Sequence, residues 1–145
     1  MIIIFFINSA LVAMAIMIHY EMLYRLSRLM PMLVIKHRYR LVVGIFGALV
    51  AHIAEIWMFA FGYYFLIRFT SWGSLTVFGS VETIHSIMDC VYYSFVTYTT
   101  LCFGDLIPTG SLRFLTGLES LTGLVLITWT ASFMYFEMRK YWNNQ

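Results

Sequence analysis

Three long apolar runs constrain how this chain can fold more than any other feature of its sequence. They cover residues 2–20, 41–67 and 114–135, and the first 18 residues carry no charge. Charged residues make up only 11% of the chain, against about 25% in soluble domains, and the mean hydropathy is +0.82. About 20 apolar residues are enough to cross a bilayer as a helix. The sequence therefore predicts an all-α membrane protein with three transmembrane helices.

Basic residues gather between Met22 and Arg40, a stretch that contains no acidic residue. They are Arg25, Arg28, Lys36, Arg38 and Arg40. Two more, Arg139 and Lys140, follow the third run. An excess of Lys and Arg beside membrane ends marks the cytoplasmic side. We therefore expect a multi-pass protein of the cell (inner) membrane, with its N-terminus outside and its C-terminus in the cytoplasm.

Pro31 lies within this connection and predicts a break after Met30. We expect residues 1–24 to form a peripheral transmembrane helix, and residues 25–40 to form a basic cytoplasmic connection with a short amphipathic surface helix and a turn. The basic cluster has two interpretations. It either binds an anionic lipid or serves only as a topology signal that lies on the lipid headgroups.

His52 and Glu55 lie one helical turn apart inside the second apolar run. Ionisable groups at such a depth are costly, and they face protein or water rather than lipid. The two residues can form a structural hydrogen-bonding pair between helices, or a proton-sensitive gating element, since histidine titrates near neutral pH. A metal site is a third interpretation, although two ligands fall short of a closed coordination set.

The segment 68–85 is mostly polar and small and predicts an external turret. Ser86 and Asp89 then have the spacing of a capping box, which predicts a helix over residues 86–99. Such a helix is too short to cross a bilayer. A polar stretch follows it directly, which indicates a re-entrant segment that is buried in protein.

This polar stretch, Thr99-Thr100-Leu101-Cys102-Phe103-Gly104-Asp105, resembles the selectivity filter of potassium channels at six of its seven positions. The mismatch is Cys102, where that family has its first Gly. The flanking segments are similar to the two-helix pore module of the potassium-channel superfamily, as found in small prokaryotic channels. The resemblance covers about residues 41–141 and leaves the first helix outside the module.

The resemblance implies a homotetramer in the lipid bilayer, in which backbone carbonyls around one axis replace the water shell of a potassium ion. The implied ion-binding filter residues are Thr100, Leu101, Cys102, Phe103 and Gly104, with the potassium sites on the carbonyls of the first four. The residues implied to support the filter are Asp105, Tyr92, Tyr93 and Glu119.

Cys102 raises the question of ion selectivity. Gly is favoured where such a loop needs a positive φ, and a Cys held in the left-handed region costs about 1–2 kcal/mol in each subunit. If the Cys102 thiols face the pore, they form a site sensitive to soft metals or oxidants. The alternative is a small side chain that packs against the pore helix.

The third run is expected to form an inner helix over residues 112–137. Its segment Leu118-Glu119-Ser120-Leu121-Thr122-Gly123 resembles the Leu-Glu-x-x-x-Gly pattern of small bacterial pore proteins. Gly123 is either a gating hinge or a site of close helix packing. Glu119 either accepts hydrogen bonds behind the filter or faces a solvent-filled vestibule.

The expected pore module covers residues 41–145. Its expected parts are an outer helix 41–67, a turret 68–85, a pore helix 86–99, a filter 100–105 and an inner helix 112–137. The expected function is passive transport of potassium. The alternatives are a weakly selective channel that also passes sodium, and a non-conducting accessory or sensing subunit. An enzyme is not expected, since no nucleophile and base cluster outside the pore region. Nucleic-acid binding is not expected either, since the basic residues form no stripe with aromatics.

Overall fold

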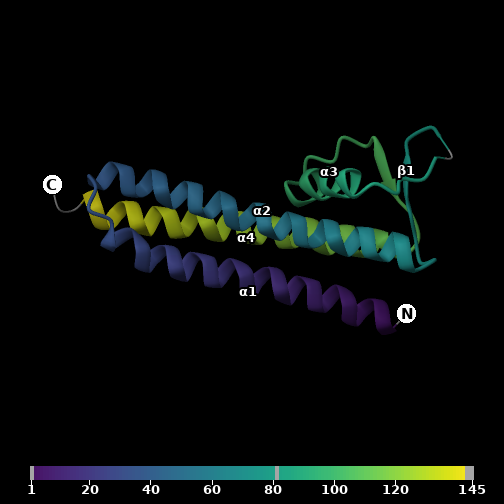
Figure 1. Cartoon of the computed structure of the whole chain (residues 1–145), viewed down its shortest axis with the longest axis horizontal. Helices are drawn as coiled ribbons and strands as arrows, with labels where there is room; N and C mark the ends of the chain where they lie inside the picture. Colours follow the sequence, from purple (N-terminus) through teal and green to yellow (C-terminus); the bar gives the residue numbers. More distant parts are fainter. Residues whose placement is uncertain (1, 81, 143–145) are drawn as a thin grey trace.

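Three long helices lie side by side in this computed structural model, and a short helix rests over one end of them (Figure 1). The structure describes residues 2–80 and 82–142. The N-terminus lies at the end that carries the short helix, and the connection between the first two helices lies at the opposite end (Figure 1). The element order is α1 (Ile2–Met32), α2 (His37–Phe69), β1 (Leu75–Val77), α3 (Ile87–Tyr98), β2 (Leu106–Pro108) and α4 (Leu112–Trp142).

The three long helices are apolar enough to cross a membrane. Within the described residues, the candidate spans are Ile2–Met32, Tyr39–Phe69 and Leu112–Lys140. A span of 31 residues is about 46 Å long at 1.5 Å per residue, whereas the hydrocarbon core of a bilayer is about 30 Å thick. The chain is therefore a mostly helical membrane protein, and its long helices extend beyond the hydrocarbon.

Helix α1 is longer than the sequence predicted. It continues through the expected surface segment to Met32, with Pro31 in its last turn. The extension buries one apolar face, at helical spacing, formed by Leu23, Leu26 and Met30. This packing keeps the segment helical up to Pro31, which removes one backbone hydrogen bond only one residue before the helix ends. The expectation of a separate amphipathic surface helix was therefore wrong.

Helix α3 and the two strands position the loop between them. Ser86 is the N-cap of α3, and its hydroxyl accepts a hydrogen bond from the Met88 N–H at 3.2 Å. Strands β1 and β2 pair antiparallel, with Thr76 opposite Ile107. This sheet was not predicted from the sequence, because strands of three residues are too short to show a clear alternation. The sheet ties the segment before α3 to the segment after residue 105.

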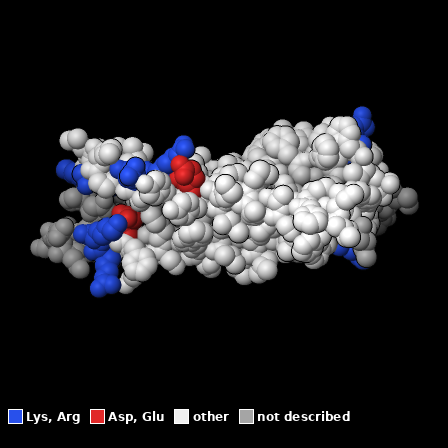
Figure 2. Space-filling view, turned by 90° about the horizontal axis from the view of Figure 1, so that it is seen from below, with Lys and Arg blue, Asp and Glu red and all other residues white. Residues whose placement is uncertain are grey.

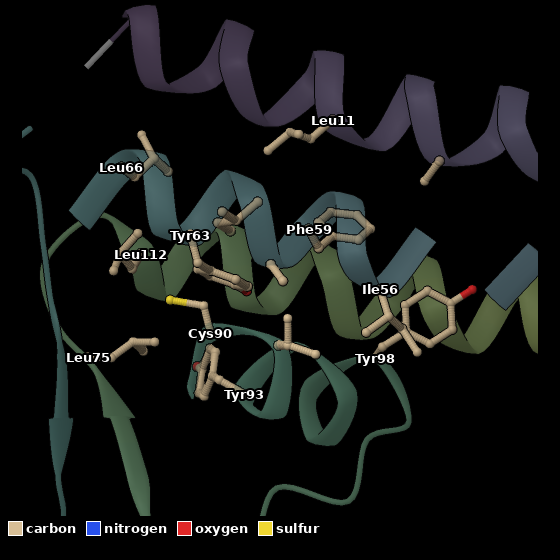
Figure 3. Close-up of a cluster of buried hydrophobic side chains, with 14 of the residues drawn as sticks. Leu11, Ile56, Phe59, Tyr63, Leu66, Leu75, Cys90, Tyr93, Tyr98 and Leu112 are labelled. Atoms are coloured by element: carbon tan, nitrogen blue, oxygen red, sulfur yellow. The ribbon is translucent and has the colours of Figure 1, made fainter. Parts of the chain in front are cut away.

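The main core lies where α3 covers the long helices (Figure 3). Its buried side chains come from every helix and from β1, and they include Leu11, Phe59, Tyr63, Leu75, Cys90, Tyr93 and Leu112. A second, smaller core joins α1 to its neighbours near the opposite end. The short helix is thus fixed by packing against α2 and α4, rather than by its own twelve residues.

Charged side chains are concentrated at the end of the molecule where α1 turns into α2 and α4 ends (Figure 2). The exposed basic residues there include Arg25, Arg28, Lys36, Arg139 and Lys140. The side chain of Arg38 lies outside what the structure describes. In the same view, the middle of the molecule carries no charged side chain on its surface, as suits contact with hydrocarbon (Figure 2).

Candidate functional site

The loop Thr99–Asp105 has a backbone that alternates in conformation. Thr100, Cys102 and Gly104 have φ angles of 61°, 36° and 81°. The two intervening residues do not have positive φ. The left-handed region costs about 1–2 kcal/mol for a residue with a side chain, so tertiary contacts must hold Thr100 and Cys102 in place. A backbone that alternates in this way turns successive carbonyl oxygens toward one side.

Hydrogen bonds fix the middle and the end of this loop. The Cys102 N–H donates to the Val96 carbonyl at 3.1 Å, and the Phe78 N–H donates to the Asp105 carbonyl at 2.8 Å. The Tyr92 hydroxyl donates to Asp105 Oδ2 at 2.8 Å. This hydrogen bond to a carboxylate raises the pKa of Tyr92, because the neutral phenol is the form that donates it. Helix α3 and the residue that follows β1 therefore both hold the loop.

The loop side chains are exposed in the single chain. Leu101 and Phe103 are 62% and 68% exposed, although both are large and apolar. Cys102 is exposed as well, so it is not packed beneath α3. The other thiol, Cys90, is buried, and burial raises its pKa to about 11. Only the Cys102 thiol is thus placed to react with a reagent from solution.

Glu119 is fully buried behind α3. Its Oε2 accepts a hydrogen bond from the Tyr63 hydroxyl at 2.6 Å, and its Oε1 accepts one from the Ser94 hydroxyl. The Ser94 hydroxyl also lies 2.8 Å from the Ile56 carbonyl. Glu119 therefore joins α2, α3 and α4, and of its two predicted placements the structure has the buried one.

Tyr93 lies beside this carboxylate but bonds to another group. Its hydroxyl is 2.9 Å from Thr116 Oγ1, and its ring packs edge to face on Tyr63, with centroids 5.1 Å apart. The two adjacent tyrosines of α3 thus point in different directions. Tyr92 reaches the end of the loop, whereas Tyr93 anchors α3 to α2 and α4.

Gly123 lies at a very close approach between α4 and the end of α3. A Cβ atom added to it would lie 2.2 Å from the Tyr98 carbonyl oxygen. Helix α4 is continuous across this position. The structure therefore places Gly123 at a packing contact directly before the loop, and a role in gating stays a prediction.

His52 and Glu55 are part of a larger cluster than the sequence analysis predicted. His19 of α1 lies with its Nδ1 2.9 Å from Glu55 Oε1. The Tyr98 hydroxyl donates to Glu55 Oε2, and Thr130 Oγ1 lies 3.0 Å from His52 Nε2. His19, Tyr98 and Thr130 were not selected from the sequence. His19 carried one usable signal, an ionisable group near the end of an apolar run.

A comparison with protein families places these features in context. Residues 39–139 match a family model described as an ion channel. Comparisons with curated proteins and with solved structures find no significant match. The matched segment begins in α2, ends in α4 and includes α3 and the loop. The chain therefore belongs to the ion channel family, of the potassium-channel superfamily type, and residues 39–139 are its channel pore module.

Proposed function

We propose that four copies of this chain assemble into a channel that conducts potassium, with the loops Thr99–Asp105 around the axis. The observation that carries this proposal is the positive φ at Thr100, Cys102 and Gly104, every second residue of the loop. Four such loops supply rings of carbonyl oxygens that can replace the hydration shell of a dehydrated cation. The carbonyls of Thr100 to Phe103 are the proposed potassium sites.

The orientation of α3 adds to this preference for cations. The helix ends at Tyr98, directly before the loop. The C-terminus of a helix carries about half a negative elementary charge. Four such ends directed toward the axis favour a cation there and disfavour an anion. The pore is passive in this proposal, and its residues perform no covalent chemistry.

The exposed apolar residues support an assembly of several chains. Leu101 and Phe103 belong to a loop rather than to a membrane span, so lipid is not their natural cover. The loop needs other copies both to surround an ion and to cover these side chains. A homotetramer meets both needs with one symmetric arrangement.

The distribution of charge supports one orientation in the membrane. Lys and Arg gather at the end where α1 turns into α2 (Figure 2). By the positive-inside rule this end is cytoplasmic. The N-terminus and the loop then lie toward the outside, and the C-terminus lies in the cytoplasm of a cell whose inner membrane holds the channel. Anionic lipid headgroups are natural neighbours of this basic end.

A weakly selective cation channel is the second candidate, and Cys102 is the observation that favours it. A residue with a side chain sits at a φ of 36°, where the potassium-channel pattern has Gly. If four such residues shift to relieve strain, the carbonyl rings widen and sodium passes as well. The same strain could also close the pore, which would leave the chain as an accessory subunit.

The deciding experiment measures the reversal potential of the purified chain in planar bilayers between potassium and sodium solutions. We expect a current that selects potassium, and Cys102→Gly should keep or sharpen that selectivity. A poorly selective parent whose selectivity returns in Cys102→Gly would establish the second candidate. Silence of both proteins, with tetramers present by mass measurement, would contradict conduction and leave the accessory function.

Two glycine variants make a matched control. Gly104→Ala and Gly79→Ala each place a side chain at a similar positive φ, 81° and 76°, and neither added Cβ meets an atom within 4 Å. Only Gly104 lies in the loop. We expect Gly104→Ala to abolish or broaden the current and Gly79→Ala to leave selectivity unchanged. Equal effects of the two variants would contradict the proposed position of the ion path.

A further inference from the structure

We propose that His19, His52 and Glu55 form a binding site for a transition-metal ion of the zinc class. The three residues come from two helices and meet inside the membrane-spanning part of the molecule. One ligand atom from each lies within 4.8 Å of the other two. This site is separate from the proposed potassium path, and its assignment does not depend on whether the channel conducts.

Each imidazole lies at a distance from one of the two Glu55 oxygens that is close to the spacing of ligands around a tetrahedral ion. His19 Nδ1 lies 2.9 Å from Glu55 Oε1, and His52 Nδ1 lies 3.3 Å from Glu55 Oε2. Ligands at about 2.0–2.1 Å from zinc lie about 3.3 Å from one another in a tetrahedron. Two imidazole nitrogens and one carboxylate oxygen are a known ligand set for zinc, and three protein ligands leave one position for water.

The Nε2 atoms of His19 and His52 share one hydrogen-bond partner. His19 Nε2 and His52 Nε2 lie 3.3 Å and 3.0 Å from Thr130 Oγ1. Metal-binding histidines nearly always donate their other ring N–H to such a group, which fixes the ring. A hydroxyl oxygen has two lone pairs and can accept both hydrogen bonds. Thr130 therefore has the position of an orienting residue for both ligands.

The contacts around the cluster are compatible with a bound ion. With an ion at the centre, both Nδ1 lone pairs face the metal, and both Nε2–H groups donate to the Thr130 oxygen, which can accept two hydrogen bonds. The Tyr98 hydroxyl lies 2.9 Å from His52 Nδ1 and keeps its hydrogen bond to Glu55.

The burial of the Glu55 carboxylate favours a positive charge in the site. His19 and Glu55 are fully buried. A buried carboxylate is costly unless a positive charge or several donors offset it. The Tyr98 hydroxyl donates one hydrogen bond to it, and neutral imidazoles can add hydrogen bonds but no positive charge. A divalent cation between the three ligands offsets that charge directly.

His52 offers a route by which a metal ion can enter the site. The side chain of His52 is 13% exposed, and it lines a cavity of about 450 Å³ between α2, α3 and α4 together with Tyr98 and Thr130. A metal ion that enters this cavity meets His52 before the buried ligands His19 and Glu55. A bound ion would join α1, which lies outside the matched module, to Glu55 of α2, and Glu55 accepts a hydrogen bond from Tyr98 at the end of α3.

Cobalt(II) is the probe for this site, because its visible absorption intensifies when it becomes four-coordinate with nitrogen and oxygen ligands. The full chain is purified with both cysteines replaced (Cys90→Ser and Cys102→Ser) so that thiolates cannot bind. We expect saturation at one cobalt per chain and displacement by zinc. His19→Gln and Glu55→Gln should each weaken binding at least about 100-fold, and Thr130→Val about 10- to 100-fold.

His85→Gln is the matched control. His85 is exposed and pairs with Thr83, outside the cluster, so its loss should leave the affinity unchanged. No saturable cobalt in the parent, or unchanged binding in His19→Gln, would overturn the proposal. If His19→Gln does not elute as the assembled protein, X-ray absorption of the zinc-loaded parent decides instead. A spectrum that shows two imidazole ligands on zinc supports the proposal. A spectrum that shows only oxygen ligands overturns it.

Discussion

At the scale of single residues, Gly123 shows how one missing side chain can position a functional loop. The carbonyl of Tyr98 occupies the space where a Cβ would lie. Tyr98 ends α3, and the alternating loop begins directly after it. Close packing of α4 against this carbonyl therefore fixes where the loop starts. Gly117 lies on the same helix, and a Cβ added there meets no atom within 4 Å.

These two glycines give a prediction with a built-in comparison. We expect Gly123→Ala to destabilise the fold by about 1–3 kcal/mol, as overpacking typically does, because the obstacle is backbone rather than a flexible side chain. Gly117→Ala should be neutral or stabilising by about 0.5–1 kcal/mol, since Ala favours a helix interior. Detergent-induced unfolding followed by circular dichroism measures both. Equal stability of the two variants would contradict the close contact.

At the scale of elements, the short sheet is held by a close approach of two backbone segments. A Cβ at Gly110 would lie 2.3 Å from the Trp72 carbonyl oxygen, and one at Gly73 would lie 2.3 Å from the Thr109 carbonyl oxygen. The Ser74 N–H also donates to Thr109 Oγ1 at 3.0 Å. This contact ties the segment before β1 to the start of α4. It fixes the segment that leads to α3 and the segment that follows the loop.

We predict that Gly110→Ala destabilises the protein by clearly more than Gly79→Ala. Both glycines have a positive φ, 58° and 76°, so each substitution carries the cost of about 1–2 kcal/mol for the left-handed region. Only Gly110 adds a clash with backbone. Thermal unfolding monitored by tryptophan fluorescence compares the two variants. A similar loss of stability in both variants would mean that the backbone segments at Gly73 and Gly110 can separate at no cost in free energy.

At the scale of the whole molecule, the two ends of the helical bundle differ in charge. Figure 2 shows the Lys and Arg side chains mainly at one end, with a few at the other. The alternating loop and the sheet lie at the opposite end from the α1 to α2 connection (Figure 1). A membrane protein of this shape has one orientation that places most of its basic residues in the cytoplasm.

Thiol labelling in sealed vesicles tests this orientation. In the background that lacks both native cysteines, Lys36→Cys should react only with reagent on the cytoplasmic side, and Ser80→Cys only with reagent on the outside. Both positions are exposed in the structure, so neither depends on the pore for access. Labelling of both positions from the same side would contradict three membrane crossings between the N-terminus and the C-terminus.

The sequence by itself determined the features that depend on local composition and spacing. Burial of apolar surface and the cost of charge in hydrocarbon define the three spans. The basic connection, the capped helix that begins at Ser86 and the pattern of the filter loop are also visible in short stretches of sequence. Each of these signals comes from neighbouring residues, so no knowledge of the fold is needed to recognise them.

Only the tertiary structure decided which distant residues meet. His19 and Glu55 are 36 residues apart in sequence, and Tyr98 reaches Glu55 across 43 residues. The burial of Glu119 behind α3 likewise depends on Tyr63, 56 residues earlier. Helical periodicity predicts which face of a helix is apolar but not which face of another helix packs against it. The cluster of His19, His52 and Glu55 therefore exists only because α1 packs on α2 in this register.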